Sequence, residues 1–244
     1  MCDATSVYSD AFLEALGAWQ RGWREDPIRR GALSERLQAQ VAMLPQAVRQ
    51  VSHECYRKRF LYRGELGSIM LADGGLDEGF ASWTQDPKFA HRFHGFHRPE
   101  AITAAIFAHT PTNDEILLNT VVLWDDAEFR RALEQFVSRN GPNSDALMKF
   151  RANQGEVILH VPLRWNEIVG LSGIGDAFDD IADAQGIIEA ARAPILRDLM
   201  EVRIYPGEPR WIWGNRAHLL LNGTRNRVVD MINAALESRQ EDSR

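Results

Sequence analysis

The sequence predicts an α+β fold, with a helical N-terminal part over residues 1–58 and a mixed body of strands and helices over residues 59–244. Between residues 9 and 58 the apolar residues recur every three or four positions, which is the spacing of one face of a helix. Beyond that point short segments alternate apolar and polar residues, which is the spacing of one face of a strand. The segment "GEVILHVPL", residues 155–163, is the clearest strand of the chain.

Composition and charge limit the classes of protein to which the chain can belong. The chain has 244 residues, 45% hydrophobic and 25% charged residues, and a net charge of -6. These values are ordinary for a soluble globular protein, and the acidic balance gives no overall support for nucleic-acid binding. Two cysteines, Cys2 and Cys55, are too few for a disulfide scaffold and suit a reducing cytosol. The first residues lack the basic and apolar stretches of a signal peptide, and no apolar run reaches about 18 residues, so we expect a cytoplasmic protein without a membrane segment.

Three helical pieces are expected in the N-terminal part. The first begins at Ser9 or Asp10, either of which can cap a helix. Its apolar stripe consists of Phe12, Leu13, Leu16, Trp19 and Trp23. After a break at "DPIRRG", a second helix begins near Ser34 and ends or kinks at Pro45, and a third piece covers residues 46–58.

The body begins with two expected strands, "RFLYRGEL" and "FASWTQ". A helix follows, because Asp86 can cap it and Pro87 suits its first turn. "AITAAIFAHTP" and "EILLNTVVLW" are expected as strands joined by a turn. "DDAEFRRALEQFVSRNG" is expected as a helix capped by Asp125. Its buried stripe is Phe129, Leu133, Phe136 and Val137.

The C-terminal third is expected to hold a helix within residues 176–193 and a strand at "LMEVRIYP". Residues 207–222 are expected to add edge strands, among them the "WIW" of residues 211–213. Thr224 is expected to cap the last helix. Its inward residues are Val228, Ile232, Ala235 and Leu236.

Three of the expected strands each present polar groups on one face, because side chains two apart on a strand point the same way. These groups are Arg63 on the first, Ser82 and Thr84 on the second, and Gln154 and Glu156 on the third. Antiparallel strands often alternate in this way simply because one face of the sheet is solvated. Periodicity alone therefore leaves both a site and an ordinary outward face open.

The order of the three motifs, "LYRGE", "FASWTQDPKFAHRF" and "NQGEVIL", resembles the arginine–serine–glutamate class of mono-ADP-ribosyltransferases. This class includes the cholera-type and clostridial Rho-modifying toxins. The resemblance covers about residues 58–165 and implies a split mixed β-sandwich, NAD as co-substrate, no metal, and a role as toxin or effector. The second motif departs from the usual Ser-Thr-Ser, and the spacing between the first two motifs is short.

The resemblance also implies roles for the matched residues. Glu156 would hold the ribose 2'-hydroxyl as positive charge develops on the sugar, which is preferential binding of the transition state. Arg63, with Gly64 beside it, would bind the pyrophosphate through its planar guanidinium fork. Ser82 would orient Glu156 and contact the nicotinamide ribose, with Thr84 in support.

The acceptor is expected not to be arginine, because the resemblance associates Gln154 with other acceptors, namely amide side chains and nucleic-acid bases. An amide can hydrogen-bond either of them. RNA or DNA is preferred to protein, because Lys149, Phe150 and Arg151 place an aromatic ring between two cations and a basic run, residues 57–59, precedes the first motif. The basic run is equally typical of a solvated helix end. A neutralising antitoxin or immunity protein is a further expected partner.

Other readings remain beside this one. A degenerate relative could bind NAD or a partner without turnover, and an NAD glycohydrolase would release nicotinamide without labelling an acceptor. His91, His94 and His97 have no further ligands at a recognised spacing, so no metal site is expected. "WIW" is expected to pack in the core or at a sheet edge rather than to stack on bases.

Overall fold

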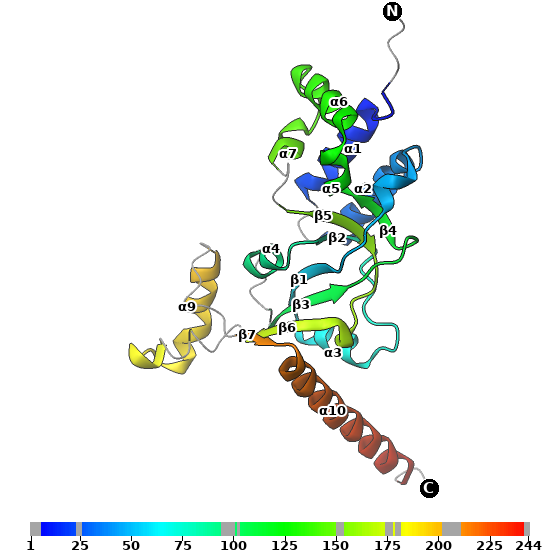
Figure 1. Cartoon of the computed structure of the whole chain (residues 1–244). Coiled ribbons are helices and arrows are strands. Elements are labelled where there is room, and N and C mark those ends of the chain that lie inside the picture. Colours follow the sequence, from blue (N-terminus) through cyan, green and yellow to red (C-terminus); the bar gives the residue numbers. More distant parts are fainter. Residues whose placement is uncertain are drawn as a thin grey trace, which may run out of the picture. The chain divides into compact units, whose positions relative to one another are not determined.

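The computed structural model describes residues 6–22, 26–93, 101, 103–149, 154–173, 178, 182–201 and 211–241 (Figure 1). The described residues form a mixed α+β structure, as predicted. The chain divides into two compact units that are interleaved along the sequence. The first unit comprises Met1–Arg57, Glu78–Arg92 and His109–Val161, and the second comprises Lys58–Asp77, Phe93–Ala108 and Pro162–Arg244. The expected boundary at residue 58 falls within the strand β1 (Cys55–Leu61).

The first unit opens with two helices, α1 (Asp10–Arg21) and α2 (Pro27–Val41). Ser9 caps α1 as predicted, since its hydroxyl accepts a hydrogen bond from the Phe12 N–H at 3.2 Å. Helix α2 begins well before the predicted Ser34, because Asp26 caps it through the N–H groups of Ile28 and Arg29. The segment "DPIRRG" therefore starts a helix instead of breaking one.

Four strands form the sheet of the first unit in the order β4-β5-β2-β1. Besides β1 they are β2 (Phe80–Thr84), β4 (Ile116–Asn119) and β5 (Glu156–His160). The pairings β1–β2, β2–β5 and β4–β5 are antiparallel. The third helical piece that was expected up to residue 58 is only a short 3-10 turn, η1 (Gln46–Arg49), followed by a loop over residues 50–54 and then by β1.

Helices α5 (Thr120–Asp125), α6 (Ala127–Ser138) and α7 (Ser144–Lys149) complete the first unit with the short α4 (Pro87–Arg92). The strand expected over "EILLNTVVLW" stops at Asn119, whose side chain accepts from the Val121 N–H and caps α5. Asp126, not Asp125, caps α6. Helix α1 packs against α2, α6 and α7 beside β5 (Figure 1). The shared core includes Phe12, Leu13, Leu16, Trp19, Leu118, Phe129, Leu133 and Ile158.

The second unit continues from β1 through the strand order β1-β3-β6-β7. Its other strands are β3 (Thr103–His109), β6 (Ile168–Gly173) and β7 (Trp211–Trp213). Its helical elements are α3 (Arg63–Leu71), η2 (Trp165–Glu167), α9 (Glu189–Glu201) and α10 (Asn215–Glu241). The expected strand "LMEVRIYP" is wrong in its first three residues, which end α9, and its remainder lies outside the described residues.

The prediction that "RFLYRGEL" is one strand is also wrong. Strand β1 ends at Leu61 and α3 begins at Arg63. The Glu65 carboxylate accepts a hydrogen bond from the Tyr62 backbone N–H at 2.9 Å and so caps the new helix from its third residue. Arg63 is therefore a first-turn helical residue and not a strand residue.

The last helix, α10, begins at Asn215 instead of Thr224. Its N-terminal half buries Ala217 and Leu221. Ile232 and Leu236, which were expected to point inward, are 44% and 52% exposed. None of the helices in the described ranges combines the length and the apolar character that crossing a membrane requires.

Candidate active site

A hydroxyl and a carboxylate meet on neighbouring strands of the first unit. Thr84 of β2 lies opposite Glu156 of β5, and Ser82 lies opposite Ile158, so Ser82 and Glu156 are diagonal neighbours on one face. The Ser82 hydroxyl donates to Glu156 Oε1 at 2.6 Å. The alternation of side chains along β2 and β5 thus places the two groups in direct contact.

Helix α1 contributes two further donors to the same carboxylate. The Trp19 indole N–H lies 3.3 Å from Glu156 Oε1 and 3.2 Å from Ser82 Oγ. The Gln20 amide donates from Nε2 to Glu156 Oε2 at 2.8 Å. Reasoning from the sequence missed both roles, because Trp19 was assigned to an apolar stripe and no local pattern singled out Gln20.

In this polar cluster of Trp19, Gln20, Ser82 and Glu156, three side chains are buried and Ser82 is half-buried. Glu156 is 7% exposed and Gln20 is 8% exposed. A solvated outer face of the sheet, the alternative that periodicity left open, does not describe these strands. Charged groups at such depth need several hydrogen-bond partners, and Glu156 has three donors.

Counting lone pairs shows where the cluster still has acceptor capacity. A carboxylate offers about four acceptor positions, two on each oxygen. Ser82 and Trp19 occupy both on Glu156 Oε1, and Gln20 occupies one on Oε2. One position on Oε2 remains, and the Gln20 Oε1 beside it is buried without a hydrogen-bond partner. Two acceptor atoms from neighbouring side chains can therefore receive two further donors.

Thr84 and Gln154 have mainly structural contacts. The Thr84 hydroxyl donates to the Gln154 carbonyl and accepts from the Asp86 N–H at 3.0 Å. Gln154 was expected in the strand, but it lies in a bend before β5. Gly155 follows with a φ of 52°, a left-handed conformation that suits glycine. Thr84 thus fixes the chain that enters β5 at Glu156.

The basic run at residues 57–59 is neither a solvated helix end nor a free phosphate patch. Arg57 donates to the Ser82 carbonyl at 2.7 Å and pairs with Glu78 at 3.2 Å. Arg59 is 5% exposed and pairs with Glu65 at 3.2 Å. Arg57 therefore holds the backbone of the strand that carries the Ser82 hydroxyl.

Lys58, the third cation of the run, belongs to the second unit. Its ammonium lies 5.2 Å from the centre of the Trp211 ring and 5.4 Å from that of Phe60. Burial lowers the pKa of Lys58 to about 8. The Trp211 and Trp213 rings stack on each other at 5.3 Å in the edge strand β7, in line with the expected edge-strand packing.

The other predicted site residues are distributed as follows. Arg63 and Gly64 open α3 in the second unit, and the side chain of Arg63 lies outside the described part of the structure. Phe150 and Arg151 also lie outside the described residues, whereas Lys149 is exposed at the end of α7.

Metal ligands do not gather in the described ranges, where no group of three or more His, Cys, Asp or Glu side chains is placed to hold an ion. Of the three histidines considered above, His91 lies in the last turn of α4, and His94 and His97 lie outside those ranges. The cluster itself offers a different chemistry. A carboxylate oriented by a hydroxyl can accept hydrogen bonds from a sugar and stabilise positive charge that develops on it.

Comparison of the chain with protein-family models, with curated proteins and with solved structures finds no match.

Proposed function

We propose that the chain is an NAD-dependent mono-ADP-ribosyltransferase, acting as a toxin or effector, with Glu156 and Ser82 at its reaction centre. The observation that carries the proposal is the pair of acceptors left open on Glu156 Oε2 and Gln20 Oε1. A ribose presents two adjacent hydroxyls, and two acceptor atoms on a hydrogen-bonded pair of side chains suit such a diol. The order of the three sequence motifs supports the same reaction.

The chemistry follows from these groups. The bond between ribose C1' and the nicotinamide nitrogen breaks, and nicotinamide leaves with the bonding pair as a neutral molecule. A bond from C1' to the acceptor forms, and the acceptor gives up a proton. The leaving nitrogen is already cationic, so no strong acid is needed, and the positive charge appears on the ribose. A hydrogen bond from the 2'-hydroxyl to Glu156 strengthens as that charge grows.

The neighbouring residues position the carboxylate. Ser82 and Trp19 fix Oε1, so the sugar hydroxyl would bind at Oε2. Gln20 would receive the second hydroxyl. Arg63 would bind the pyrophosphate, a role that rests on the sequence resemblance.

The acceptor is proposed to be a neutral group that an amide can hydrogen-bond. The reason is that Gln154 occupies the position that the resemblance links to the choice of acceptor. The internal pairing of Arg57 and Arg59 withdraws one of the arguments for nucleic acid. The preference for RNA or DNA now rests on Gln154 and on residues 149–151.

Nicotinamide release from NAD, followed by chromatography, tests the reaction. We expect Glu156→Gln to lower the rate at least about a hundredfold, the usual cost of one stabilising group. The fold should tolerate this change, because Gln20 can rotate its amide and accept from the new N–H2 group. Glu134→Gln, the same change at an exposed position of α6, is the control and should leave the rate unchanged. Equal rates for Glu156→Gln and the parent chain would exclude Glu156 as a reaction-centre residue.

Transfer of label from adenylate-labelled NAD to a lysate identifies the acceptor. Label that is lost on nuclease treatment indicates a base, and label that is lost only on protease treatment indicates a protein side chain. Nicotinamide release without any labelled macromolecule indicates an NAD glycohydrolase.

A second candidate is a binding module that has lost turnover. The burial of Glu156 beneath Trp19 and Gln20 favours it, because a sugar reaches the carboxylate only if one of these side chains moves. Calorimetry that detects NAD binding to the parent chain, together with no nicotinamide release, would establish this candidate in place of the transferase.

A further inference from the structure

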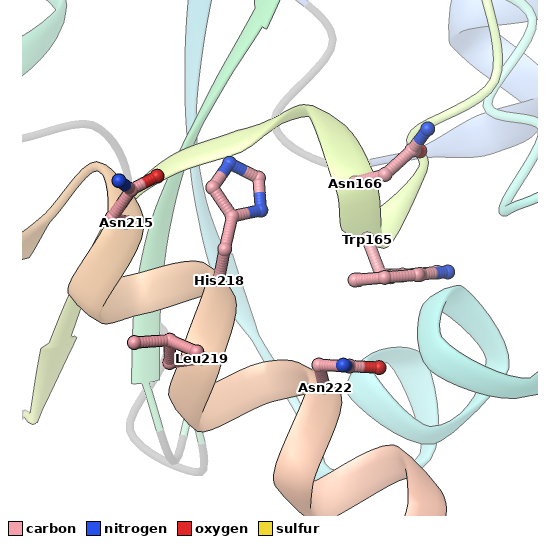
Figure 2. Close-up of a pocket in the computed structure, with 6 residues that line it drawn as sticks. All are labelled: Trp165, Asn166, Asn215, His218, Leu219 and Asn222. Carbon is pink, nitrogen blue, oxygen red and sulfur yellow. The ribbon is translucent and has the colours of Figure 1, made fainter.

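A pocket of about 390 Å³ lies in the second unit, where η2 and the start of β6 face the first turns of α10 (Figure 2). It is lined by Trp165, Asn166, Asn215, His218, Leu219 and Asn222. All six residues belong to the second unit, so the pocket does not depend on Glu156 or on the proposed transfer reaction. Its volume is in the range of small-molecule sites.

The lining combines one large aromatic ring with side chains that both donate and accept hydrogen bonds. Asn215 and Asn222 come from α10 and Asn166 from η2, and the three carboxamides stand around the hollow beside His218 (Figure 2). Asn166, Asn215 and Asn222 are exposed, so a ligand reaches them from solvent. None of the six lining side chains is an acid or a strong base.

Contacts outside the pocket hold the Trp165 ring in place. The Arg225 guanidinium lies 5.7 Å from the centre of the Trp165 ring, and Arg225 Nε donates to the Met70 carbonyl at 2.9 Å. Arg225 is thereby tied to α3 and braces the ring from the next turns of α10. A ring held in this way loses little freedom when a planar group stacks on it.

This chemistry selects among ligand classes. A free carboxylate or phosphate would need a cation in the lining, and an amine would need an acid. A flat heterocycle matches best, because a base stacks on an aromatic ring and its edge carries both donors and acceptors. Asparagine can pair with such an edge through two hydrogen bonds, as it does with adenine.

We propose that this pocket binds a nucleobase, with Trp165 as the stacking surface and Asn222 as a hydrogen-bonding partner of the base edge. Two sources provide the same chemistry, a free nucleotide or a base of a single strand. The open rim of exposed asparagines admits either one.

Binding is tested on the full-length chain with adenosine monophosphate, uridine monophosphate and a fluorescein-labelled single-stranded oligonucleotide. Saturation-transfer NMR monitors the nucleotides, and fluorescence anisotropy monitors the oligonucleotide. Trp165→Leu should weaken binding about tenfold or more through loss of stacking. Asn222→Ala, at an exposed position that the fold tolerates, should weaken it about fivefold.

Asn226→Ala is the matched control, since it makes the same change one turn further along α10 outside the pocket, and it should alter the affinity less than twofold. If the chain binds a mononucleotide about as tightly as it binds the oligonucleotide, the pocket is assigned to free nucleotides. Binding of the oligonucleotide alone assigns it to a strand. Absence of binding to all three probes, or equal binding by Asn222→Ala and Asn226→Ala, overturns the proposal. Glu156→Gln should bind as the parent does, so this outcome is separate from that of the transferase assay.

Discussion

Gln20 links helix α1 to the buried carboxylate, and its replacement by a second acid is the most direct test of the polar cluster. Gln20→Glu would bring two carboxylates together at positions that are 8% and 7% exposed in the parent chain. Like charges at short range cannot both ionise without a large cost. We expect the free energy of unfolding to fall by at least about 2 kcal/mol at pH 7.5.

The pH dependence of Gln20→Glu has a definite sign. A shared proton relieves the repulsion, so the loss relative to the parent chain should shrink as the pH falls from 7.5 to 5. Urea titrations at both pH values measure it. Gln38→Glu, on the exposed side of α2, is the control, and an equal loss in both variants would mean that Gln20 does not contact Glu156 in solution.

Lys58 gives a second prediction at this scale. Burial lowers its pKa in the folded chain to about 8 from the ordinary lysine value of 10.5. Between these two values the unfolded chain binds more protons, so the free energy of unfolding rises with pH across that window. Below pH 8 the ammonium is charged in both states, and the folded state carries the full cost of burying it.

Lys58→Met should therefore be more stable than the parent chain at pH 7, and its advantage should shrink between pH 8 and pH 10.5. Urea titrations at pH 7, 8, 9 and 10 follow the difference. Lys88→Met makes the same change at an exposed position of α4 and serves as the control. An advantage for Lys58→Met that is constant over this range would contradict the lowered pKa.

Among the elements, those with local signals were predictable from sequence. The Ser9 cap predicts α1, the Asp86-Pro87 pair predicts α4, and the short segments "FASWTQ" and "GEVILHVPL" predict β2 and β5. The contact of Ser82 with Glu156 also follows from the alternation of side chains along a strand, once the two strands are neighbours. The donors from α1 could not be foreseen, because Trp19 and Glu156 are 137 residues apart and no local pattern joins them.

Two of the predicted element boundaries that were wrong show the physical reason most clearly. The end of β1 is set by a single side chain, since Glu65 reaches back to the Tyr62 N–H and starts α3 where alternation alone continues the strand. The start of α10 was missed because "AHLLLNG" lacks the apolar and polar spacing of an amphipathic helix. It also contains a glycine, which lowers helix propensity. Burial of Ala217 and Leu221 outweighs that propensity.

Helix α10 should show a steep gradient of stability along its length. Leu221 is 2% exposed, so Leu221→Ala should cost about 2–4 kcal/mol of unfolding free energy through the cavity it leaves. Leu236 is 52% exposed, so Leu236→Ala should cost less than about 1 kcal/mol. Urea unfolding followed by circular dichroism compares the two variants. Similar losses would mean that the C-terminal half of α10 is covered in solution.

At the scale of the whole molecule, the interleaving of the two units limits how the chain can be divided. The first unit takes residues from both sides of residue 58, and its core joins Phe12 and Leu13 of α1 to Phe129 of α6. Removal of residues 1–58 would expose that core and take away two of the three donors to Glu156.

We therefore expect a chain that begins at residue 59 to lack a cooperative unfolding transition and to show poor dispersion in an amide NMR spectrum. A shorter deletion of residues 1–5, which lie before the described part, is the control and should unfold like the parent chain. A well-dispersed spectrum for the longer deletion would show that residues 59–244 form an autonomous domain.

The long separation between α1 and β5 also bears on synthesis. Trp19 precedes Glu156 by 137 positions, so at translation rates of about 5–20 residues per second the carboxylate is made on the order of ten seconds after the indole that holds it. The nascent chain therefore carries α1 without strand β5 and its carboxylate for that whole interval. Chaperones that shield apolar segments on the ribosome would meet this helix before β5 is made, and the polar cluster is among the last parts of the first unit to assemble.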